Sequence, residues 1–565
     1  MNLQTLTDPL VRDTLASLPL FLPELILCGT ILVMLLARVF PLTDRIPAFY
    51  LALLGAAASL WFAIPAQGFE GEGAVVPQGM FSQLLIYDSF TIFFRCVLLL
   101  FIVLFCVLTR ISRLMDPEDN TDFYSLVLGA TLGMLLMASA NHLLIVFLAV
   151  EMASVPSFVL AGILKGRRRS SEASLKYAVY GAGAAGVMLY GISLLCGLLG
   201  SAHLPTMAQQ LAALNLPELI ASETGGSTIR VLALGGLMLM VGLAFKLSAV
   251  PFHFWCPDVF EGASAEINAF LSVASKAAAL ALLVRVAIGF GFVPMEPAEP
   301  VVTAGVFSVA DELQPATEAT VADDAMHPDS PLAALQPVRT FAVYLLAFIA
   351  TITCTFGNLA AYGQTNIKRL LAYSTIAHAG YMMMPVAAAM AAISISPAVA
   401  QDAISALTLY IVLYLFMNLG AFAVVAFLRN AMGSEEIDDY AGLIVSCPVT
   451  VICFALLLVS LIGLPPLAGF IGKLKIFMVL IDVGGPVMIG LLVVAGVNTV
   501  ISLVYYLWVI KVMTIDPEPD DRGPVALAWI PVAYTVAITV PVVVLGVWFD
   551  AAYRFARAAS LHLFL

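Results

Sequence analysis

Apolar stretches of membrane-spanning length recur along almost the whole chain, separated by short polar segments. A helix needs about 20 consecutive apolar residues to cross a bilayer, so each stretch predicts one transmembrane helix. The predicted spans cover residues 18–38, 47–65, 85–108, 122–140, 142–164, 174–200, 230–257, 262–290, 340–361, 368–391, 403–429, 447–480, 487–513 and 525–549. The pattern therefore predicts an all-α membrane protein with about 14 transmembrane helices.

Two predicted spans, the seventh and the twelfth, are long and interrupted by proline. Pro251 interrupts the seventh, and Pro465 with Pro466 interrupts the twelfth. A proline inside a span frees backbone carbonyls, which is tolerated only where protein or a cavity satisfies them. The two broken helices lie five spans apart, and each carries a lysine near the break. This correspondence predicts two inverted five-helix repeats, formed by helices 4–8 and helices 9–13.

The spans divide the chain into five regions. These are N-terminal helices 1–3 (1–121), a first repeat (122–290), a non-membrane insert (291–339), a second repeat (340–513), and helix 14 with a tail (514–565). Within the insert, residues 292–338 carry eight carboxylates and no lysine or arginine. The insert is interpreted as an irregular cover or a docking surface, and both interpretations stay open.

Loop charges predict the orientation of the chain, because cytoplasmic loops of membrane proteins are enriched in lysine and arginine. The basic residues that follow odd-numbered spans are Arg38, Arg45, Arg110, Arg113, Lys165, Arg167, Arg168, Arg169, Lys368, Arg369, Arg429, Lys511 and Arg522. The loops after even-numbered spans hold only Arg230 and Arg339. Odd-numbered loops are therefore predicted to be cytoplasmic, and both termini periplasmic.

The composition agrees with a membrane protein and excludes several other classes. Of 565 residues, 62% are hydrophobic and 11% are charged, and the mean hydropathy is +1.02. No soluble domain has this composition. The net charge of −12 comes with no basic face, which argues against nucleic-acid binding. The eight cysteines contain no C-x-x-C pair, which argues against an iron–sulfur or zinc site.

Four ionisable residues fall in the middle of apolar spans or at their breaks: Glu151, Lys246, Lys276 and Lys473. A charge at bilayer depth costs several kcal/mol, so it persists mainly where it is paired or lines a watery path. One acid and three lysines on four different spans therefore predict a proton route. For each residue the alternative is a purely structural role, such as a hydrogen-bonded acid, a lysine that snorkels to the interface, or a packing pair.

Each of these residues has a predicted role. A carboxylate beside a lysine keeps that lysine charged, and the lysine can release its proton when the carboxylate moves away. Glu151 and Lys246 are therefore predicted to form a switch pair. Lys276, flanked by small residues, is predicted to relay the proton. Lys475 lies about 200° around the helix from Lys473, so only Lys473 is expected to face the route.

His378 lies among hydroxyl-bearing residues in the segment YSTIAHAGY. It is predicted to extend a hydrogen-bonded chain between Lys276 and Lys473, with a satisfied core histidine as the alternative. His253, at the proline break, is interpreted as structural. Asp258 and Glu261 follow this break and are interpreted either as proton-gathering groups or as a helix cap.

Four further charged residues are expected to be structural. Asp88 and Arg95 lie seven residues apart on one face of the third span, so they are expected to form a pair or a lipid-interface contact. Arg285 and Glu24 lie near the ends of their spans and are expected to snorkel toward the interface.

Five segments together resemble the proton-translocating membrane subunits of respiratory complex I, which are related to Mrp-type antiporter subunits. The segments are VEMASVPSFVLAG (150–162), SEASLKYAVYGA (171–182), FKLSAVPFHFWCPDVFEGA (245–263), NIKRLLAYSTIAHAGY (366–381) and GLPPLAGFIGKLKIF (463–477). The resemblance covers roughly residues 122–510, and the N-subunit (NuoN) family fits best. The sister M subunit usually carries glutamate where this chain has Lys473, and the L subunit usually has a long lateral helix after helix 14.

The resemblance implies a subunit of a proton-pumping NADH:quinone oxidoreductase in the bacterial inner membrane. It implies that Glu151, Lys246, Lys276 and Lys473 form the central hydrophilic axis. It also implies that this chain binds no cofactor, that NADH, FMN, iron–sulfur clusters and quinone belong to other subunits, and that its partners are the other membrane-arm subunits. The alternatives are a cation/proton antiporter subunit, a membrane hydrogenase subunit, or a non-conducting scaffold of the membrane arm.

Overall fold

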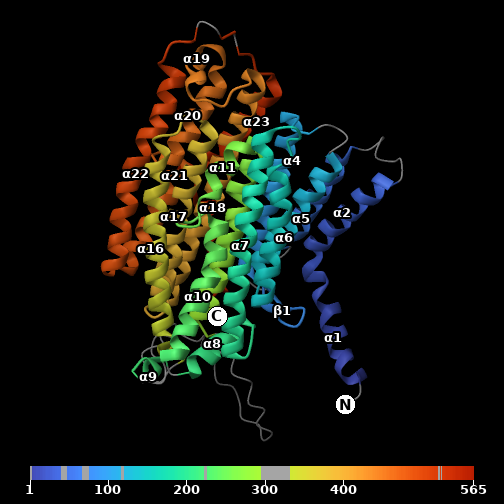
Figure 1. The fold of residues 1–565 in the computed structure, drawn as a ribbon, viewed down its shortest axis with the longest axis vertical. Helices are drawn as coiled ribbons and strands as arrows, with labels where there is room; N and C mark the ends of the chain where they lie inside the picture. The colour runs from blue at the N-terminus through green and yellow to red at the C-terminus, as the bar shows by residue number, and fades with distance from the viewer. Residues whose placement is uncertain are drawn as a thin grey trace, which may run out of the picture.

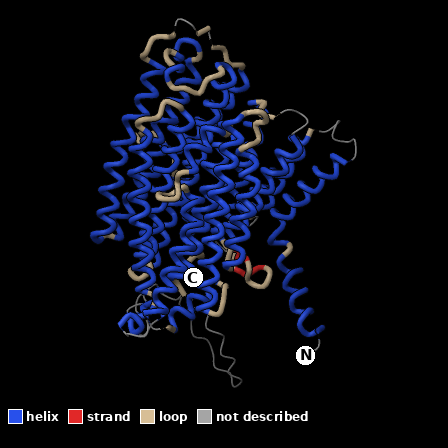
Figure 2. Tube along the Cα trace, viewed as in Figure 1, coloured by secondary structure: helices blue, strands red, loops and turns tan. Residues whose placement is uncertain are grey.

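The computed structural model of the protein is almost entirely helical (Figure 2). It describes residues 3–39, 47–65, 75–115, 120–214, 216–221, 226–293, 331–519, 522–523 and 525–564. Most of the predicted acidic insert, residues 294–330, lies outside the described residues. The helices run mainly along the long axis of the molecule (Figure 1).

The N-terminal region contains four helices and a short hairpin. They are α1 (Leu3–Ser17), α2 (Leu22–Val39), α3 (Ala48–Ala63), β1 (Gln78–Met80), β2 (Leu85–Tyr87) and α4 (Ser89–Ser112). The two strands pair antiparallel, with Gly79 opposite Ile86. The hydrophobic pattern predicted α2, α3 and α4 but neither α1 nor the hairpin, because the pattern was read only for lengths that span a bilayer.

The predicted first repeat contains α5 (Asn120–Ser139), α6 (Leu143–Ala161), α7 (Arg168–Leu199), α8 (Leu204–Ala213), α9 (Leu216–Ala221), α10 (Gly226–Leu247), α11 (Trp255–Gly262), α12 (Ala265–Phe270) and α13 (Lys276–Gly291). A π-helical turn, Leu271–Ser275, joins α12 to α13. The short helices α8 and α9 lie at the same end of the molecule as the N-terminus (Figure 1).

The rest of the chain contains α15 (Pro331–Ala334), α16 (Gln336–Ala361), α17 (Ile367–Ala392), α18 (Pro397–Met432), α19 (Leu443–Ser446), α20 (Pro448–Ile462), α21 (Ala468–Val483), α22 (Gly485–Thr514), α23 (Trp529–Val547) and α24 (Asp550–Ser560). In the described residues, 12 helices are long and apolar enough to cross a membrane, and Ala48–Ala63 and Pro448–Ile462 are shorter apolar helices. The protein is therefore a multi-pass helical membrane protein.

The segment Ala265–Gly291 and helices α17 and α18 form the core of the bundle, and they are far more buried than α22 or α23. Close contact between α16 and α17 depends on two glycines. A Cβ at Gly357 would lie 2.6 Å from the backbone N of Ala377, and one at Gly380 would lie 2.6 Å from the backbone N of Cys354. The small residues let the two backbones approach, which is a common way to pack helices in membranes.

Both predicted helix breaks are present. Helix α10 ends at Leu247 and α11 begins at Trp255, while α20 ends at Ile462 and α21 begins at Ala468. Ser248 follows the first helix end with φ +56°, and Gly463 follows the second with φ +90°. The freed backbone groups find partners at the first break, where Trp255 Nε1 donates to Phe245 O over 3.0 Å and Val250 N donates to Thr353 Oγ1 over 3.0 Å.

The tail after helix 14 is helical and packs inside the bundle. Helix α24 follows α23 after Trp548 and Phe549 and lies against α18 and α4. Ser560 Oγ and Ser405 Oγ share a hydrogen bond of 2.9 Å, and Thr408 Oγ1 donates to Ala556 O over 3.1 Å. The pattern missed this helix because α24 is short and amphipathic.

Candidate functional site

The first break places Lys246 in the protein interior. Lys246 lies in the last turn of α10 and is 1% exposed. Among the described residues its Nζ has no hydrogen-bond partner. The C-terminal end of a helix carries the negative end of the helix dipole, which favours a cation there. Lys246 is therefore a buried amine whose charged form is favoured by the end of α10. No described side chain forms a hydrogen bond with it.

Glu151 lies on α6 and is only partly buried, so it differs from the fully buried residue that the sequence predicted. Among the described residues, no ion pair or hydrogen bond joins Glu151 to Lys246. The structure therefore shows no direct contact between the two residues of the predicted switch pair. The surface of α6 near Glu151 is apolar and exposed, with Leu148 at 49% and Val155 at 54%.

Lys276 lies at the start of α13, directly after the π-helical turn, and is 1% exposed. Its Nζ donates a hydrogen bond of 3.0 Å to Thr375 Oγ1 on α17. The hydroxyl of Thr375 in turn donates to Ala372 O over 2.8 Å. Single π-helical turns within α-helices are frequent at functional sites. The contact joins the predicted first repeat to the second.

His378 lies one turn after Thr375 on the same face of α17 and is 2% exposed. Its Nδ1 is 2.7 Å from the Tyr410 hydroxyl and its Nε2 is 3.5 Å from the Tyr506 hydroxyl. The Tyr506 hydroxyl also shares a short hydrogen bond with Ser374. On α17, His378 lies between Thr375, which accepts a hydrogen bond from Lys276, and Tyr381, whose ring centre lies 4.5 Å from Lys473 Nζ.

The second break holds Lys473, which lies on α21 and is 2% exposed. Its Nζ donates a hydrogen bond of 2.8 Å to Ile462 O, a carbonyl at the end of α20. The same nitrogen lies 4.5 Å from the ring centre of Tyr381. Gly463 gives the lysine its space, because a Cβ there would lie 2.8 Å from Lys473 Cδ.

Lys475 points away from this site, as expected from its position on the helix. Its Nζ lies over the ring of Tyr553 on α24, 4.0 Å from the ring centre. This partner was not predicted, because the tail was not expected to form a helix inside the bundle. Lys475 is partly exposed, whereas Lys473 is buried.

We call four buried residues, Lys246, Lys276, His378 and Lys473, the central line. Lys276 and Lys473 both contact α17, the helix that carries His378. No carboxylate lies within ion-pair distance of these lysines among the described residues. Sequence reasoning included Tyr381 in the predicted hydrogen-bonded chain but missed Tyr410 and Tyr506, whose hydroxyls meet the two ring nitrogens of His378. The sequence signal that could have found them is a tyrosine in the middle of an apolar span, because a buried tyrosine hydroxyl usually needs a hydrogen-bond partner.

Asp258 and Glu261 form a charged network with basic residues of neighbouring helices. Arg369 on α17 donates to Asp258 over 3.0 Å and to Glu261 over 2.7 Å. Lys176 on α7 donates to Asp258 over 2.7 Å. The two carboxylates therefore tie α11 to α7 and α17, a structural role different from the predicted helix cap.

Asp88, Arg95, Glu24 and Arg285 are buried in two ion pairs, which corrects both the expected pairing of Asp88 with Arg95 and the expected snorkelling of Glu24 and Arg285. Arg285 makes a two-pronged contact with Asp88, at 2.7 and 2.6 Å, and Arg95 Nε is 2.7 Å from Glu24 Oε1. None of the four is more than 8% exposed. Helical spacing suggested a pair between Asp88 and Arg95, but partners from other helices replaced it.

The fold defines a multi-pass membrane protein with two broken helices and three buried lysines, Lys246, Lys276 and Lys473. The chain belongs to the NADH:quinone oxidoreductase/Mrp antiporter transmembrane family, whose profile matches residues 140–309 and 330–501.

Two named relatives match almost the full chain. It is 37% identical to NADH-quinone oxidoreductase subunit N of Anaeromyxobacter sp. (strain Fw109-5), over 98% of this chain and 99% of that protein. It is 36% identical to NADH-quinone oxidoreductase subunit N 2 of Sorangium cellulosum (strain So ce56), again over 98% and 99%.

Solved structures share the fold. A chain of respiratory complex I from Thermus thermophilus with bound aureothin is 27% identical, with a TM-score of 0.66 and coverage of 94% of this chain and 98% of that one. A chain of the Mrp complex from Dietzia sp. DQ12-45-1b is 18% identical, with a TM-score of 0.70 and coverage of 98% of both chains. At this lower identity the second likeness concerns the fold alone.

Proposed function

We propose that this chain is the N subunit of a proton-pumping NADH:quinone oxidoreductase. In this role it moves protons through Glu151, Lys246, Lys276, His378 and Lys473. One observation carries the proposal: Lys246 and Lys473 at the two helix breaks and Lys276 on α13 are all buried, and none forms an ion pair with a described carboxylate. The near full-length similarity to proteins named subunit N supports the choice of complex.

The proposed cycle begins at Glu151 and Lys246. When the carboxylate of Glu151 moves closer to Lys246, it holds the amine in the charged form. When the carboxylate moves away, Lys246 gives up its proton toward Lys276. The partly exposed position of Glu151 on α6 allows a neighbouring subunit to drive this movement, and the missing direct ion pair leaves the distance free to change.

Transfer continues along hydroxyl and imidazole groups. Lys276 donates to Thr375, and His378 lies one turn further with tyrosine hydroxyls at both ring nitrogens. These groups both donate and accept hydrogen bonds, so a proton can pass along them with the help of water. Lys473 then exchanges its proton with the far side, and Ile462 O accepts a hydrogen bond from its charged form.

The remaining parts of the assignment follow from this proposal. The chain itself holds no redox group, and NADH, FMN, iron–sulfur clusters and quinone are bound by other subunits. Its partners are the other membrane-arm subunits, and both of its termini face the periplasm of a bacterial inner membrane. Residues 122–290 and 340–513 form the two inverted repeats around the central line.

The test uses the assembled complex in sealed vesicles, where quinone reduction and proton uptake are measured together. Lys473→Met is expected to abolish most proton uptake, whereas Lys475→Met on the same helix leaves it near the wild-type level. The control is matched, because both residues are lysines on α21 and only Lys473 is buried. Normal proton uptake by Lys473→Met in an assembled complex would instead support a scaffold.

The transported ion distinguishes the antiporter alternative from the proposed proton pump. Members of the same family are Mrp antiporters. If transport by the wild-type chain required Na⁺ and persisted without quinone reduction, the antiporter assignment would replace the present one.

A further inference from the structure

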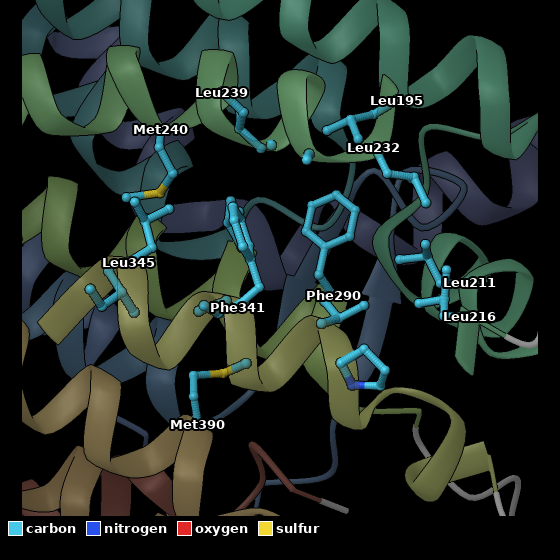
Figure 3. Close-up of a pocket in the computed structure, with 18 of the residues that line it drawn as sticks. Leu195, Leu211, Leu216, Leu232, Leu239, Met240, Phe290, Phe341, Leu345 and Met390 are labelled. Carbon is cyan, nitrogen blue, oxygen red and sulfur yellow. The ribbon is translucent and has the colours of Figure 1, made fainter. Parts of the chain in front are cut away.

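An apolar cavity of about 330 Å³ lies between helices of the two predicted repeats. Leu239 and Met240 of α10 face Phe341 and Leu345 of α16 across this space, and Phe290 of α13 projects into it (Figure 3). Every described lining residue is apolar. A cavity of this kind stays free of water, because a buried water needs polar partners.

The cavity lies at one end of the bundle. Its lining comes from α10, the end of α13, the start of α16, the short helices α8 and α9, and the ends of α7 and α17. This is the end of the molecule that carries the N-terminus (Figure 1), and loop charges predict that it faces the periplasm. Two lining residues are exposed, Phe341 at 43% and Ile220 at 59%, so the cavity reaches the surface of the chain.

Two arginines directly follow lining residues in the sequence. Arg230 follows Ile229 on α10 and is exposed, and its Nε donates to Gly226 O over 2.9 Å. Arg339 follows Val338 on α16 and is buried, and its Nη1 donates to Gly291 O over 3.2 Å. These two are the only lysines or arginines in the loops between spans that follow the predicted even-numbered spans. Arg230 is therefore the exposed cation of these loops that directly follows a lining residue.

We propose that this cavity binds one acyl chain of an anionic phospholipid from the outer leaflet, with the phosphate at Arg230. The volume is at the lower end of small-ligand pockets, and a helix from a partner is too thick to enter it. An acyl chain satisfies the apolar lining, and a guanidinium is a strong partner for phosphate. The bound chain fills the space between the two repeats and supports their packing.

Photolabelling of the assembled complex in nanodiscs tests the proposal. The probes are phosphatidylglycerol and phosphatidylcholine that carry the same photoreactive group on one acyl chain, and labelled residues are identified by mass spectrometry. In the wild-type protein, phosphatidylglycerol is expected to label the lining residues Phe290 and Phe341 above the level of phosphatidylcholine. Labelling only of lipid-facing residues outside the cavity would overturn the proposal.

Variants on one helix provide the matched control. A Cβ at Gly236 meets no atom within 4 Å, so Gly236→Phe fills the cavity and is expected to reduce labelling of Phe290 roughly tenfold. Leu237 is 42% exposed and does not line the cavity, so Leu237→Phe is expected to leave labelling unchanged. Equal labelling in the two variants would contradict an acyl chain at this position.

The headgroup assignment has its own variant. Arg230→Gln is expected to bring labelling by phosphatidylglycerol down to the level of phosphatidylcholine, while Arg230→Lys keeps part of the difference because it retains the charge. If Arg230→Gln leaves the difference in labelling between the two lipids unchanged, the phosphate contact is overturned. A photoreactive isoprenoid quinone that labels Phe290 and is not displaced by phosphatidylglycerol would overturn the choice of phospholipid.

Discussion

Two sets of buried charges lie within this one helical bundle, and they are built differently. The first, which we call the arginine cluster, consists of Glu24, Arg95, Asp88 and Arg285, and every cation in it faces a carboxylate. The second is the central line, in which Lys246, Lys276 and Lys473 form no ion pair with a described carboxylate. Both sets are almost inaccessible to solvent.

The choice of cation explains the difference. Arginine keeps its charge at any physiological pH and binds a carboxylate through two parallel hydrogen bonds, as Arg285 does with Asp88. Lysine is a single-point cation that exchanges its proton more readily when buried. The paired arginines therefore hold helices together, and the unpaired lysines fit a role in which charge appears and disappears.

The largest expected effect comes from replacing a lysine of the central line by arginine. Lys276→Arg keeps a cation next to Thr375 but cannot release its proton, so proton uptake is expected to fall by more than about tenfold. Proton uptake by vesicles is measured against quinone reduction, with Lys276→Met as the uncharged control of similar length. Wild-type pumping by the arginine variant would show that charge alone is required at this position.

The second effect concerns stability and belongs to the arginine cluster. Asp88→Asn keeps the N-cap contact with Thr91, because asparagine also caps helices. It leaves Arg285 buried without a charge partner, which is expected to destabilise the chain by about 3–5 kcal/mol. Thermal unfolding of the purified complex measures the loss.

A double variant serves as the control for this prediction. Asp88→Asn combined with Arg285→Met removes both charges and is expected to regain much of the lost stability. If the double variant is as unstable as Asp88→Asn alone, the penalty does not come from an unpaired buried arginine.

A smaller effect is expected from the glycine beside Lys473. Gly463→Ala places a Cβ 2.8 Å from Lys473 Cδ at a residue with φ +90°, so a loss of about 1–3 kcal/mol and reduced proton uptake are expected. Gly484→Ala is the control, because Gly484 has φ +68° and its Cβ would meet its nearest atom only at 3.7 Å. Reduced uptake in both variants would point to backbone strain in place of the displaced lysine.

Removing the Thr375 hydroxyl, which joins α17 to Lys276 of α13, is expected to have a modest effect on proton uptake. Thr375→Val removes the acceptor of the 3.0 Å hydrogen bond from Lys276 but keeps the shape of the side chain, so proton uptake is expected to fall several-fold. Thr375→Ser restores a hydroxyl and is expected to restore most of the rate. Equal rates in the two variants would remove Thr375 from the route.

The smallest expected effect is a pH dependence of local stability at His203, a neutral histidine outside the membrane spans. Burial, and then the charge of His142, lowers the pKa of His203 from its usual 6.5. The neutral ring accepts from Asn141 at Nε2, 3.0 Å away, and meets the Thr206 hydroxyl at Nδ1, 2.9 Å away. This contribution to stability is full above the unfolded pKa of 6.5 and is lost as the pH falls through the lower folded value.

Hydrogen exchange of α8 measures this dependence. Protection corrected for intrinsic rates is expected to fall slightly between about pH 7.5 and about pH 5.5 in the wild-type protein. His203→Gln cannot be protonated and is expected to lose this extra dependence. The same pH dependence in the variant would assign it to another group.

The sequence by itself determined the multi-pass fold, the two broken helices and the identity of the buried amines. The physical reason is that apolar spans and buried charges can be recognised from the free energy of transferring each side chain into a bilayer. This transfer free energy depends little on the neighbouring helices. For this reason Lys246, Lys276 and Lys473 stood out before any coordinates were known.

Tertiary structure alone decided which charges meet. Asp88 pairs with Arg285 from a distant helix, Lys276 meets Thr375 from the other predicted repeat, and α24 packs back into the bundle beside Lys475. Partners in a helical bundle depend on helix rotation and on close approach at small residues such as Gly357 and Gly380. Spacing along one helix contains no information about the helix that will lie opposite.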